Sequence, residues 1–451
     1  MFKYFQMIVL LSTLVLSSTG IHSQTNEKIL PYPIEQYKMQ NGLNVVTVPF
    51  DSPGIAAFYI AVRTGSRNEV EKGVTGFAHF FEHIMFRGTE RYSKEKYEEV
   101  LKSIGASANA NTSNDRTVYH MLGNVEKLEL MFEIESDRFQ NLKYSEHDFK
   151  TEAGAIKGEY TKNYADPLSR LDESINNIAF TTHTYKHTTM GFFADIVDMP
   201  NQYQYSLKFF DRYYRPEYCT VIVVGDVTQE KVNKLAEKYF GSWKNGSFKE
   251  DIPSEPMQTE TKFVHLQNGD VPPYLTLCFK GPGYSDSDVD LVALSIIEGI
   301  AFSNKSDLYQ KLVINEKKVR RVGFYPGMSR DPNLMEVYAQ LKDKNDIQYV
   351  KDELMNTLNG LKNNLVDKKM LDEVISNRKY GFIMRSDNPG SIAAILAQYI
   401  ALSGDPESLN RYYELFDKVT PEDIMKTANK YFVETGLTIG TITADENCVI
   451  K

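Results

Sequence analysis

The chain has 451 residues, of which 42% are apolar and 25% are charged, the balance of a folded protein. That length exceeds one ordinary domain and is comfortable for two. A formal net charge of −9 argues against a nucleic-acid-binding protein, which normally presents a basic face. The three cysteines, Cys219, Cys278 and Cys448, are too sparse for a disulfide scaffold and form no CxxC pair.

The first residues differ in composition from the rest of the chain. Lys3 precedes a ten-residue apolar run, Met7–Leu16, and small polar residues follow it. The run is too short to span a bilayer but matches the hydrophobic part of a secretory signal. We therefore predict a signal peptide over residues 1–23 and an exported, periplasmic protein, with secretion or an uncleaved membrane-associated signal as alternatives. No later segment of the sequence is long and apolar enough to be predicted as transmembrane.

The first half, residues 24–250, is expected to alternate strand pairs with helices. Ser93 should cap the second helix and Gly105 should end it. Several helices are expected between the second strand pair and about residue 214. The other predicted elements are strands 42–49 and 56–64, helices 75–86 and 93–104, strands 106–112, 116–123 and 219–227, and helix 228–240.

A polar segment with Gly and Pro, Ser242–Glu260, lacks periodicity and predicts a linker. The element order then restarts, so residues 251–451 are expected to repeat the first half at a spacing near 218 residues. The predicted elements are strands 262–268 and 273–281, helices 287–301 and 305–315, strands 319–326 and 334–341, further helices, and strand 437–443. The fold class is therefore α+β, with two tandem homologous domains, each a mostly antiparallel sheet covered by helices.

His79, Glu82 and His83 lie together in a run rich in phenylalanine. On a helix, residues four apart differ by about 40° in direction and about 6 Å in height, so both imidazoles project from one face beside Glu82. Such a pair can hold one Zn²⁺, with Glu82 placed as a general base. The order HxxEH is that of the inverted zincins. Two surface histidines are the alternative, but this helix is apolar nearly all round, where unpaired polar groups are costly.

A zinc site with catalytic geometry needs a third protein ligand. Glu152 and Glu159 are seven apart and share one helix face, offset by about 20°. Glu159 is the candidate ligand, and Glu152 would orient the site from one layer behind. The alternative is a solvated acidic stripe. His183 and His187 are also four apart, but no acid lies between them, and a loop or short helix is expected there.

The segment Gly76–Thr89, GFAHFFEHIMFRGT, resembles the active-site helix of the pitrilysin, insulinase and mitochondrial-processing-peptidase family of zinc peptidases. Glu159 follows His83 at the family's usual separation. The short two-domain bacterial members are similar over essentially the whole mature chain. Other segments with family counterparts are GSRNE, NANTSNDRTVY, HTYKHTTMG, YRPEYCTVIVVGDV and DLYQKLVINEKKV.

The resemblance implies one zinc ion per chain, bound by His79, His83 and Glu159. Glu82 would be the general base and Glu152 the supporting acid. The implied activity is that of an exported zinc metalloendopeptidase that hydrolyses unfolded peptides, and the two domains would form half of a clam-like chamber.

Asn111 and its neighbours Asn109 and Thr112 match a position beside the family's cleft, which implies contact with substrate. A peptide would lie extended against the edge strand within 106–123, held by main-chain hydrogen bonds that are largely blind to sequence.

The second half contains no HxxEH motif. At a spacing of 218 residues, the counterparts of His79, Glu82, His83 and Glu159 are Ile297, Ile300, Ala301 and Asn377. This half is therefore expected to have kept its shape without a metal.

Many active family members carry an Arg–Tyr pair, seven apart, in the second half. Here Lys318 and Tyr325 have that spacing, with Arg320 and Arg321 nearby, and a charged turn leading into a strand is the preferred interpretation. The departure implies a partner, either a second copy or a related metal-free subunit. A non-catalytic scaffold and a peptide-binding subunit of the same fold are the alternative functions.

Overall fold

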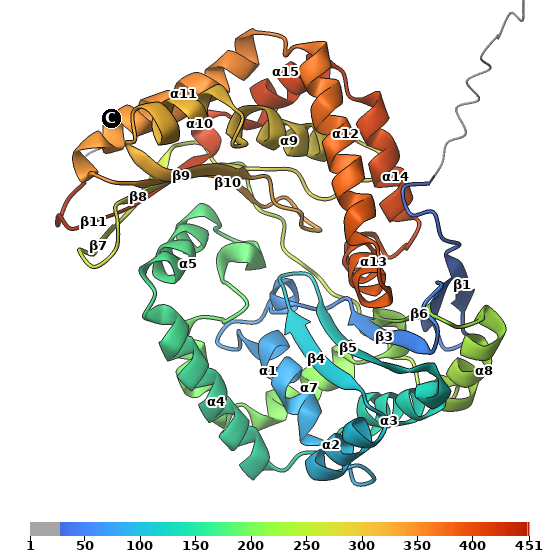
Figure 1. The fold of residues 1–451 in the computed structure, drawn as a ribbon. Coiled ribbons are helices and arrows are strands. Elements are labelled where there is room, and N and C mark those ends of the chain that lie inside the picture. Colours follow the sequence, from blue (N-terminus) through green and yellow to red (C-terminus); the bar gives the residue numbers. More distant parts are fainter. Residues whose placement is uncertain (1–27, 449, 451) are drawn as a thin grey trace, which may run out of the picture.

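The computed structural model describes residues 28–448 and 450, so the predicted signal peptide lies outside the described residues. Two lobes, each built on one sheet, face each other in the ribbon view (Figure 1). Within the described part of the chain, no helix is both long and apolar enough to cross a bilayer.

The first lobe contains a six-stranded sheet in the order β1-β2-β6-β3-β5-β4. All neighbouring strands are antiparallel except β2 and β6, and β4 has a free edge. The strands are β1 (Glu35–Lys38), β2 (Asn44–Pro49), β3 (Ile55–Val62), β4 (Ser107–Thr112), β5 (Thr117–Asn124) and β6 (Cys219–Gly225). The helices are α1 (Phe77–Ile84), α2 (Lys94–Ser103), α3 (Leu128–Asn141), α4 (Glu146–Tyr164), α5 (Pro167–Ala179), α6 (Phe193–Asp198), α7 (Tyr203–Tyr213) and α8 (Gln229–Phe240).

The second lobe contains a five-stranded sheet in the order β7-β11-β8-β10-β9. Its strands are β7 (Lys262–Gln267), β8 (Tyr274–Lys280), β9 (Val319–Tyr325), β10 (Leu334–Leu341) and β11 (Leu437–Thr443). Its helices are α9 (Asp290–Ile297), α10 (Asp307–Tyr309), α11 (Ile347–Asn363), α12 (Lys368–Arg385), α13 (Pro389–Ser403), α14 (Ser408–Glu414) and α15 (Pro421–Tyr431).

Most predicted elements are present with ends shifted by one to three residues. Ser93 caps α2 by accepting the Lys96 N–H, and Gly105 follows the helix at φ +63°. The prediction missed β1, a four-residue edge strand whose half-exposed sequence shows no apolar alternation. It also assigned two continuous helices where α9 and α10 pass into π-helical turns at Glu298–Phe302 and Gln310–Asn315.

The duplication is visible in the strand register. Asn44 of β2 pairs with Thr220 of β6, and Lys262 of β7 pairs with Thr438 of β11. The same parallel pair therefore recurs in the second half, with both of its residues the same number of positions further along the chain. The two sheets also share the order of their central strands. The α+β fold with two homologous halves is therefore confirmed.

The uniform spacing is wrong at the metal helix, because the connections around it differ in length between the halves. α1 begins at Phe77 and α9 at Asp290. The counterparts of the HxxEH residues are thus Val292, Ser295 and Ile296 rather than Ile297, Ile300 and Ala301. Aligning α4 and α12 at their capping residues likewise puts Gly381, not Asn377, opposite Glu159. Val292 and Ile296 are fully buried, so apolar packing occupies the equivalent positions.

Each half contributes a helix to the other half's sheet. α13 packs on β3 and β6 of the first sheet, while α5 packs on β7 and β11 of the second (Figure 1). One core cluster accordingly joins Ala57 and Ile222 of the first half to Ile392 and Leu396 of α13. Because apolar side chains from both halves fill this cluster, the lobes are held at a set distance and orientation.

Charged groups also join the lobes. Arg67 donates to Asp331 at 2.5 Å and to Glu250 at 3.0 Å, and Arg330 reaches the same Glu250 at 2.9 Å. His183, the first histidine of the HTYKH segment, lies 3.0 Å from Asp331 and begins a short 3-10 helix, as expected for that segment. Although burial opposes the shift, His183 and Arg67 hold the pKa of Asp331 well below its usual range.

The shared core predicts cooperative unfolding. Ile222→Ala and Leu396→Ala each remove a fully buried side chain and should each lower the free energy of unfolding by about 2–5 kcal/mol. Calorimetry should show one transition that both variants shift downward, whereas exposed Leu207→Ala should leave it unchanged. Two transitions, each moved by only one of the variants, would contradict the shared core.

Glu255 of the connecting segment predicts a pH dependence. It accepts the backbone N–H groups of Thr181, Thr182 and His183, and these bonds outweigh burial and lower its pKa from 4.5 to about 2. A lowered carboxyl pKa stabilises the fold above the unfolded value, and the gain is lost as the pH falls from 4.5 toward 2.

Thermal unfolding between pH 7 and 2 should therefore show that Glu255→Gln has a lower Tm than the wild type. The difference in Tm should be largest at neutral pH and should vanish near pH 2. Glu260→Gln, at a carboxylate with no side-chain hydrogen bond among the described residues, is the matched control. A deficit that stays constant with pH would refute the electrostatic explanation.

Candidate metal centre

Helix α1 is fixed by its two ends and by one aromatic face. Gly76 precedes it at φ +91°, and a Cβ there would lie 2.5 Å from Ile196. The carboxylate of Glu69 accepts the N–H groups of Gly76 and Ala78 at 2.7 Å each, which satisfies the free donors of the helix N-terminus. Phe81 stacks on Phe209 of α7 with the rings 5.2 Å apart. The helix therefore has little freedom to rotate about its axis.

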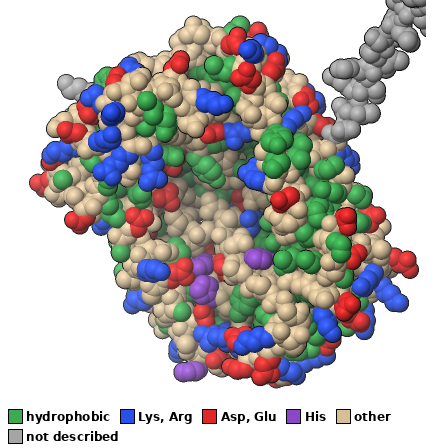
Figure 2. Space-filling model, viewed as in Figure 1, with side chains coloured by type: hydrophobic (Ala, Val, Ile, Leu, Met, Phe, Trp, Pro, Cys, Tyr) green, Lys and Arg blue, Asp and Glu red, His purple; other side chains and the backbone are tan. Residues whose placement is uncertain are grey.

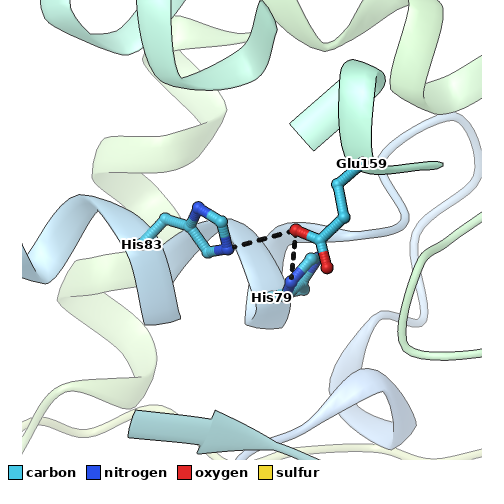
Figure 3. A group of neighbouring side chains, drawn as sticks. All are labelled: His79, His83 and Glu159. Carbon is cyan, nitrogen blue, oxygen red and sulfur yellow. Dashed lines mark ion pairs between the residues drawn. The ribbon is translucent and has the colours of Figure 1, made fainter. Parts of the chain in front are cut away.

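Three side chains converge beside this helix (Figure 3). Oε2 of Glu159, on α4, lies 3.6 Å from Nε2 of His79 and 3.5 Å from Nε2 of His83. All three ligand atoms lie within 4.8 Å of one another, and no other such group of three was found among the described residues. The structure thus brings together the three predicted ligands from segments far apart in the sequence.

The spacing of Oε2 of Glu159 from the two Nε2 atoms fits a tetrahedral zinc site. Zn–N and Zn–O bonds of about 2.0–2.1 Å put neighbouring ligand atoms of a tetrahedron about 3.3–3.4 Å apart. The observed separations of 3.5 and 3.6 Å are close to that value. Two imidazoles and one carboxylate are also a donor set that zinc prefers, and they leave a fourth position free for water or substrate.

Glu152 supports the site from the next helical layer. Its Oε1 lies 3.1 Å from Nδ1 of His83, and its Oε2 accepts from Nε of Arg87 at 2.6 Å. Burial opposes ionisation, but His83 and Arg87 together lower the pKa of Glu152. Because an ionised Glu152 can only accept a hydrogen bond, neutral His83 must carry its proton on Nδ1. Its Nε2 is then unprotonated, with its lone pair directed toward Glu159. Arg87 was missed in the sequence, although it lies one helical turn beyond His83.

The two imidazoles differ in their surroundings. His79 is buried, which lowers its pKa, and the neighbouring His83 lowers it further. The bond to Glu152 instead raises the pKa of His83, against the effect of its partial burial. Neutral His79 is thus available to a metal down to a lower pH than His83.

Glu82 lies on α1 between the two histidines and is half-buried. Its negative charge favours the protonated form of both imidazoles, although burial and His83 still lower the pKa of His79, so Glu82 lies close enough to act on the ligands electrostatically. Within the described residues, no hydrogen bond reaches its carboxylate. A carboxylate left unpaired beside a metal site suits a proton acceptor better than a structural role.

The predicted substrate-contact residues lie along β4. Asn109 and Asn111 are exposed and share one face of the strand, and Thr112 ends it. Asn111 accepts from Nη1 of Arg116 at 2.6 Å, whereas the oxygen of Asn109 bonds only to the next backbone N–H. α1 packs against β4 and β5, so the free edge of the sheet runs beside the metal centre.

The face between the lobes is hollowed, and histidine side chains gather there (Figure 2). A cavity between the lobes is lined by residues from both halves, among them Tyr325 at the end of β9. Tyr325 is 63% exposed, but Lys318 is bound to Asp346 and lies over the ring of Tyr349. That ion pair agrees with the interpretation of 318–325 as a charged turn leading into a strand.

Comparison with known proteins agrees with the fold. Residues 46–191 match the family model for insulinase (peptidase family M16), and residues 202–378 match that for the peptidase M16 inactive domain. Zinc protease PqqE of Helicobacter pylori is 28% identical over 89% of this chain and 90% of its own length. The uncharacterized zinc protease YmxG of Bacillus subtilis is 23% identical over 89% of this chain and 96% of its own length.

Solved structures share the architecture. A protease from Helicobacter pylori superposes with a TM-score of 0.83 at 28% identity, covering 91% of this chain and all of that one. The periplasmic protease PqqL of Escherichia coli gives a TM-score of 0.74 at 18% identity, over 92% of this chain and 48% of that one, and shows the fold alone.

The two family models together span most of the chain, and the three candidate metal ligands lie within the first of them. The chain therefore belongs to peptidase family M16, the insulinase family.

Proposed function

We propose that this protein is an exported zinc metalloendopeptidase that binds one zinc ion per chain and cleaves unfolded peptides. The observation that carries the proposal is that Oε2 of Glu159 lies 3.6 Å from Nε2 of His79 and 3.5 Å from Nε2 of His83, beside an unpaired Glu82. Relatives named zinc proteases support the zinc and the peptidase activity.

Bound zinc would polarise the scissile carbonyl and make water a nucleophile at neutral pH. Glu82 takes a proton from the attacking water on its carboxylate and passes it to the nitrogen of the leaving amine. Glu152 holds the Nδ1 proton of His83 and so keeps the ligand nitrogen free. The aromatic packing of α1 keeps these groups in position throughout the reaction.

The free edge of β4 supports an extended peptide substrate. An unpaired strand edge offers N–H and C=O groups to a peptide independent of its side chains, with Asn109, Asn111 and Thr112 beside it. Most backbone N–H and C=O groups of a folded protein are already paired, which favours unfolded substrates.

The half-chamber and the missing Arg–Tyr pair support a partner, either a second copy or a related metal-free subunit. The periplasm is the proposed location, in keeping with the apolar run at the N-terminus of the sequence. A scaffold or peptide-binding subunit of the same fold is the second candidate. Similarity to a structure titled peptidase M16 inactive domain, with a TM-score of 0.81, motivates it.

Two substitutions separate metal binding from catalysis. Glu82→Gln should keep stoichiometric zinc and lower kcat on a fluorogenic peptide by about 10²–10⁴-fold, because only the proton acceptor is lost. Glu159→Gln should lose both zinc and activity, because a ligand is lost. Metal analysis and peptide hydrolysis measure these outcomes. A zinc-replete wild type that cleaves no peptide would favour the scaffold, and full activity in Glu82→Gln would refute the assigned base.

Glu152→Gln tests the supporting acid. A neutral amide at residue 152 removes the negative charge that pairs with Arg87 and orients His83. The zinc affinity should therefore fall by about 10–100-fold. Competition with a chromogenic chelator measures the affinity without reference to turnover. Glu146→Gln, on the exposed first turn of the same helix, is the control and should bind zinc like the wild type. Equal affinity in both variants would remove Glu152 from the site.

A further inference from the structure

A groove of about 610 Å³ opens on the second lobe beside α13. Its walls are the C-terminal end of α12, the outer face of α13, the end of α14 and the loop that follows β9. Seven of its side chains are apolar or aromatic, namely Met328, Phe382, Met384, Ala394, Ile395, Tyr399 and Tyr413. Arg385 and Asp387 also line it, and their opposite charges leave no net charge on the walls.

The apolar walls of this groove are accessible. Met384 is 58% exposed, Ala394 is exposed and Ile395 is half-buried, whereas the other apolar side chains of α13 are buried. A helix that is apolar nearly all round normally has all its faces covered. Exposed apolar surface that is concave and gathered in one place marks a binding site more often than a defect of packing.

The groove adjoins the strand edge proposed to bind peptide. Gln398, which lines the groove, accepts from Nε of Arg116 at 2.9 Å, and Nη1 of the same Arg116 donates to Asn111 on β4. On the other wall, Met328 lies two residues before Arg330, whose backbone N–H donates to Asp115 at 3.0 Å. The hairpin between β4 and β5 therefore touches both walls.

The direction of the side chains on β4 also links a bound peptide to the second lobe. Asn111 lies opposite Val118 in the β4–β5 register, and paired residues project from the same face of a sheet. Val118 belongs to the core cluster that contains Leu396 of α13. A peptide added to the edge of β4 would consequently turn every second side chain toward the second lobe.

We propose that this groove is a specificity subsite that accepts an apolar side chain of the peptide bound along β4. The inference rests on the proposed function and narrows its substrate class to peptides with a large apolar residue a few positions from the cleaved bond. The apolar walls and balanced charges disfavour a charged side chain, which would be desolvated without a partner.

The test uses fluorogenic peptides that differ only by Leu or Asn at one position, scanned on both sides of the cleaved bond. At one position the zinc-loaded wild type should prefer Leu by about 10–100-fold in kcat/KM, the range that one hydrophobic pocket supplies. Ala394→Trp, which fills the groove, and Met384→Asn, which makes it polar, should remove that preference and leave the Asn peptide unaffected.

Ile383→Asn is the matched control, because Ile383 is a neighbouring apolar residue that is 49% exposed and does not line the groove. It should keep the preference. Thermal unfolding verifies that each variant is folded.

Binding of labelled Leu and Asn peptides to Glu82→Gln, with and without Ala394→Trp, gives a readout without turnover. If Glu82→Gln binds the Leu peptide more tightly than the Asn peptide, and Ala394→Trp abolishes this difference, the groove assignment is supported. This holds even if the wild type cleaves no peptide, a result that would defeat only the proposed function. No preference at any position, or the same loss in Ile383→Asn as in Met384→Asn, would overturn the groove assignment.

Discussion

The packing of α1 against its aromatic neighbours is the constraint on which the metal centre depends. Two imidazoles one helical turn apart can meet one ion only if the helix presents that face and no other. Phe77, Phe80 and Phe81 are fully buried and fix the rotation of the helix, while Glu69 anchors its first turn. The polar face that remains is the one that meets α4, where Glu159 completes the ligand set.

Electrostatics then assign different roles to similar groups. Glu152 and Glu159 lie on one helix, but Glu152 is nearly buried and paired with Arg87 and His83, whereas Glu159 is more exposed and faces both Nε2 atoms. The carboxylate of Glu152 is held ionised and orients the ligand His83, whereas the carboxylate of Glu159 is free to act as a ligand itself. Two residues of the same type thus differ in function because their neighbours differ.

Duplication explains the shape around this site. The halves repeat the same sheet register, yet each covers part of the other's sheet, α13 on the first and α5 on the second. In the second half, Val292 and Ile296 occupy the positions of the two histidines and are buried in the core. Apolar packing therefore fills the positions that polar side chains occupy in the first half.

The local features of the chain could be predicted from its residues alone. The HxxEH spacing identified the metal helix, because a helix has a fixed period, and Ser93 and Gly105 marked the ends of α2 through cap chemistry that depends only on adjacent residues. Alternating apolar residues located β10 to the residue. Glu159 could be ranked as a ligand only by resemblance, since a helix face alone suits a solvated carboxylate equally well.

The contacts between distant groups could not be predicted in this way and became known from the packing of the folded chain. The Arg87–Glu152 pair, the exchange of α5 and α13 between lobes, and the Arg116–Gln398 contact join residues separated by tens to hundreds of positions. No local period encodes such contacts, because they follow from how whole elements pack. The shift of the second-half counterparts to Val292 and Ile296 has the same origin, since loop lengths change freely while packed helices keep their places.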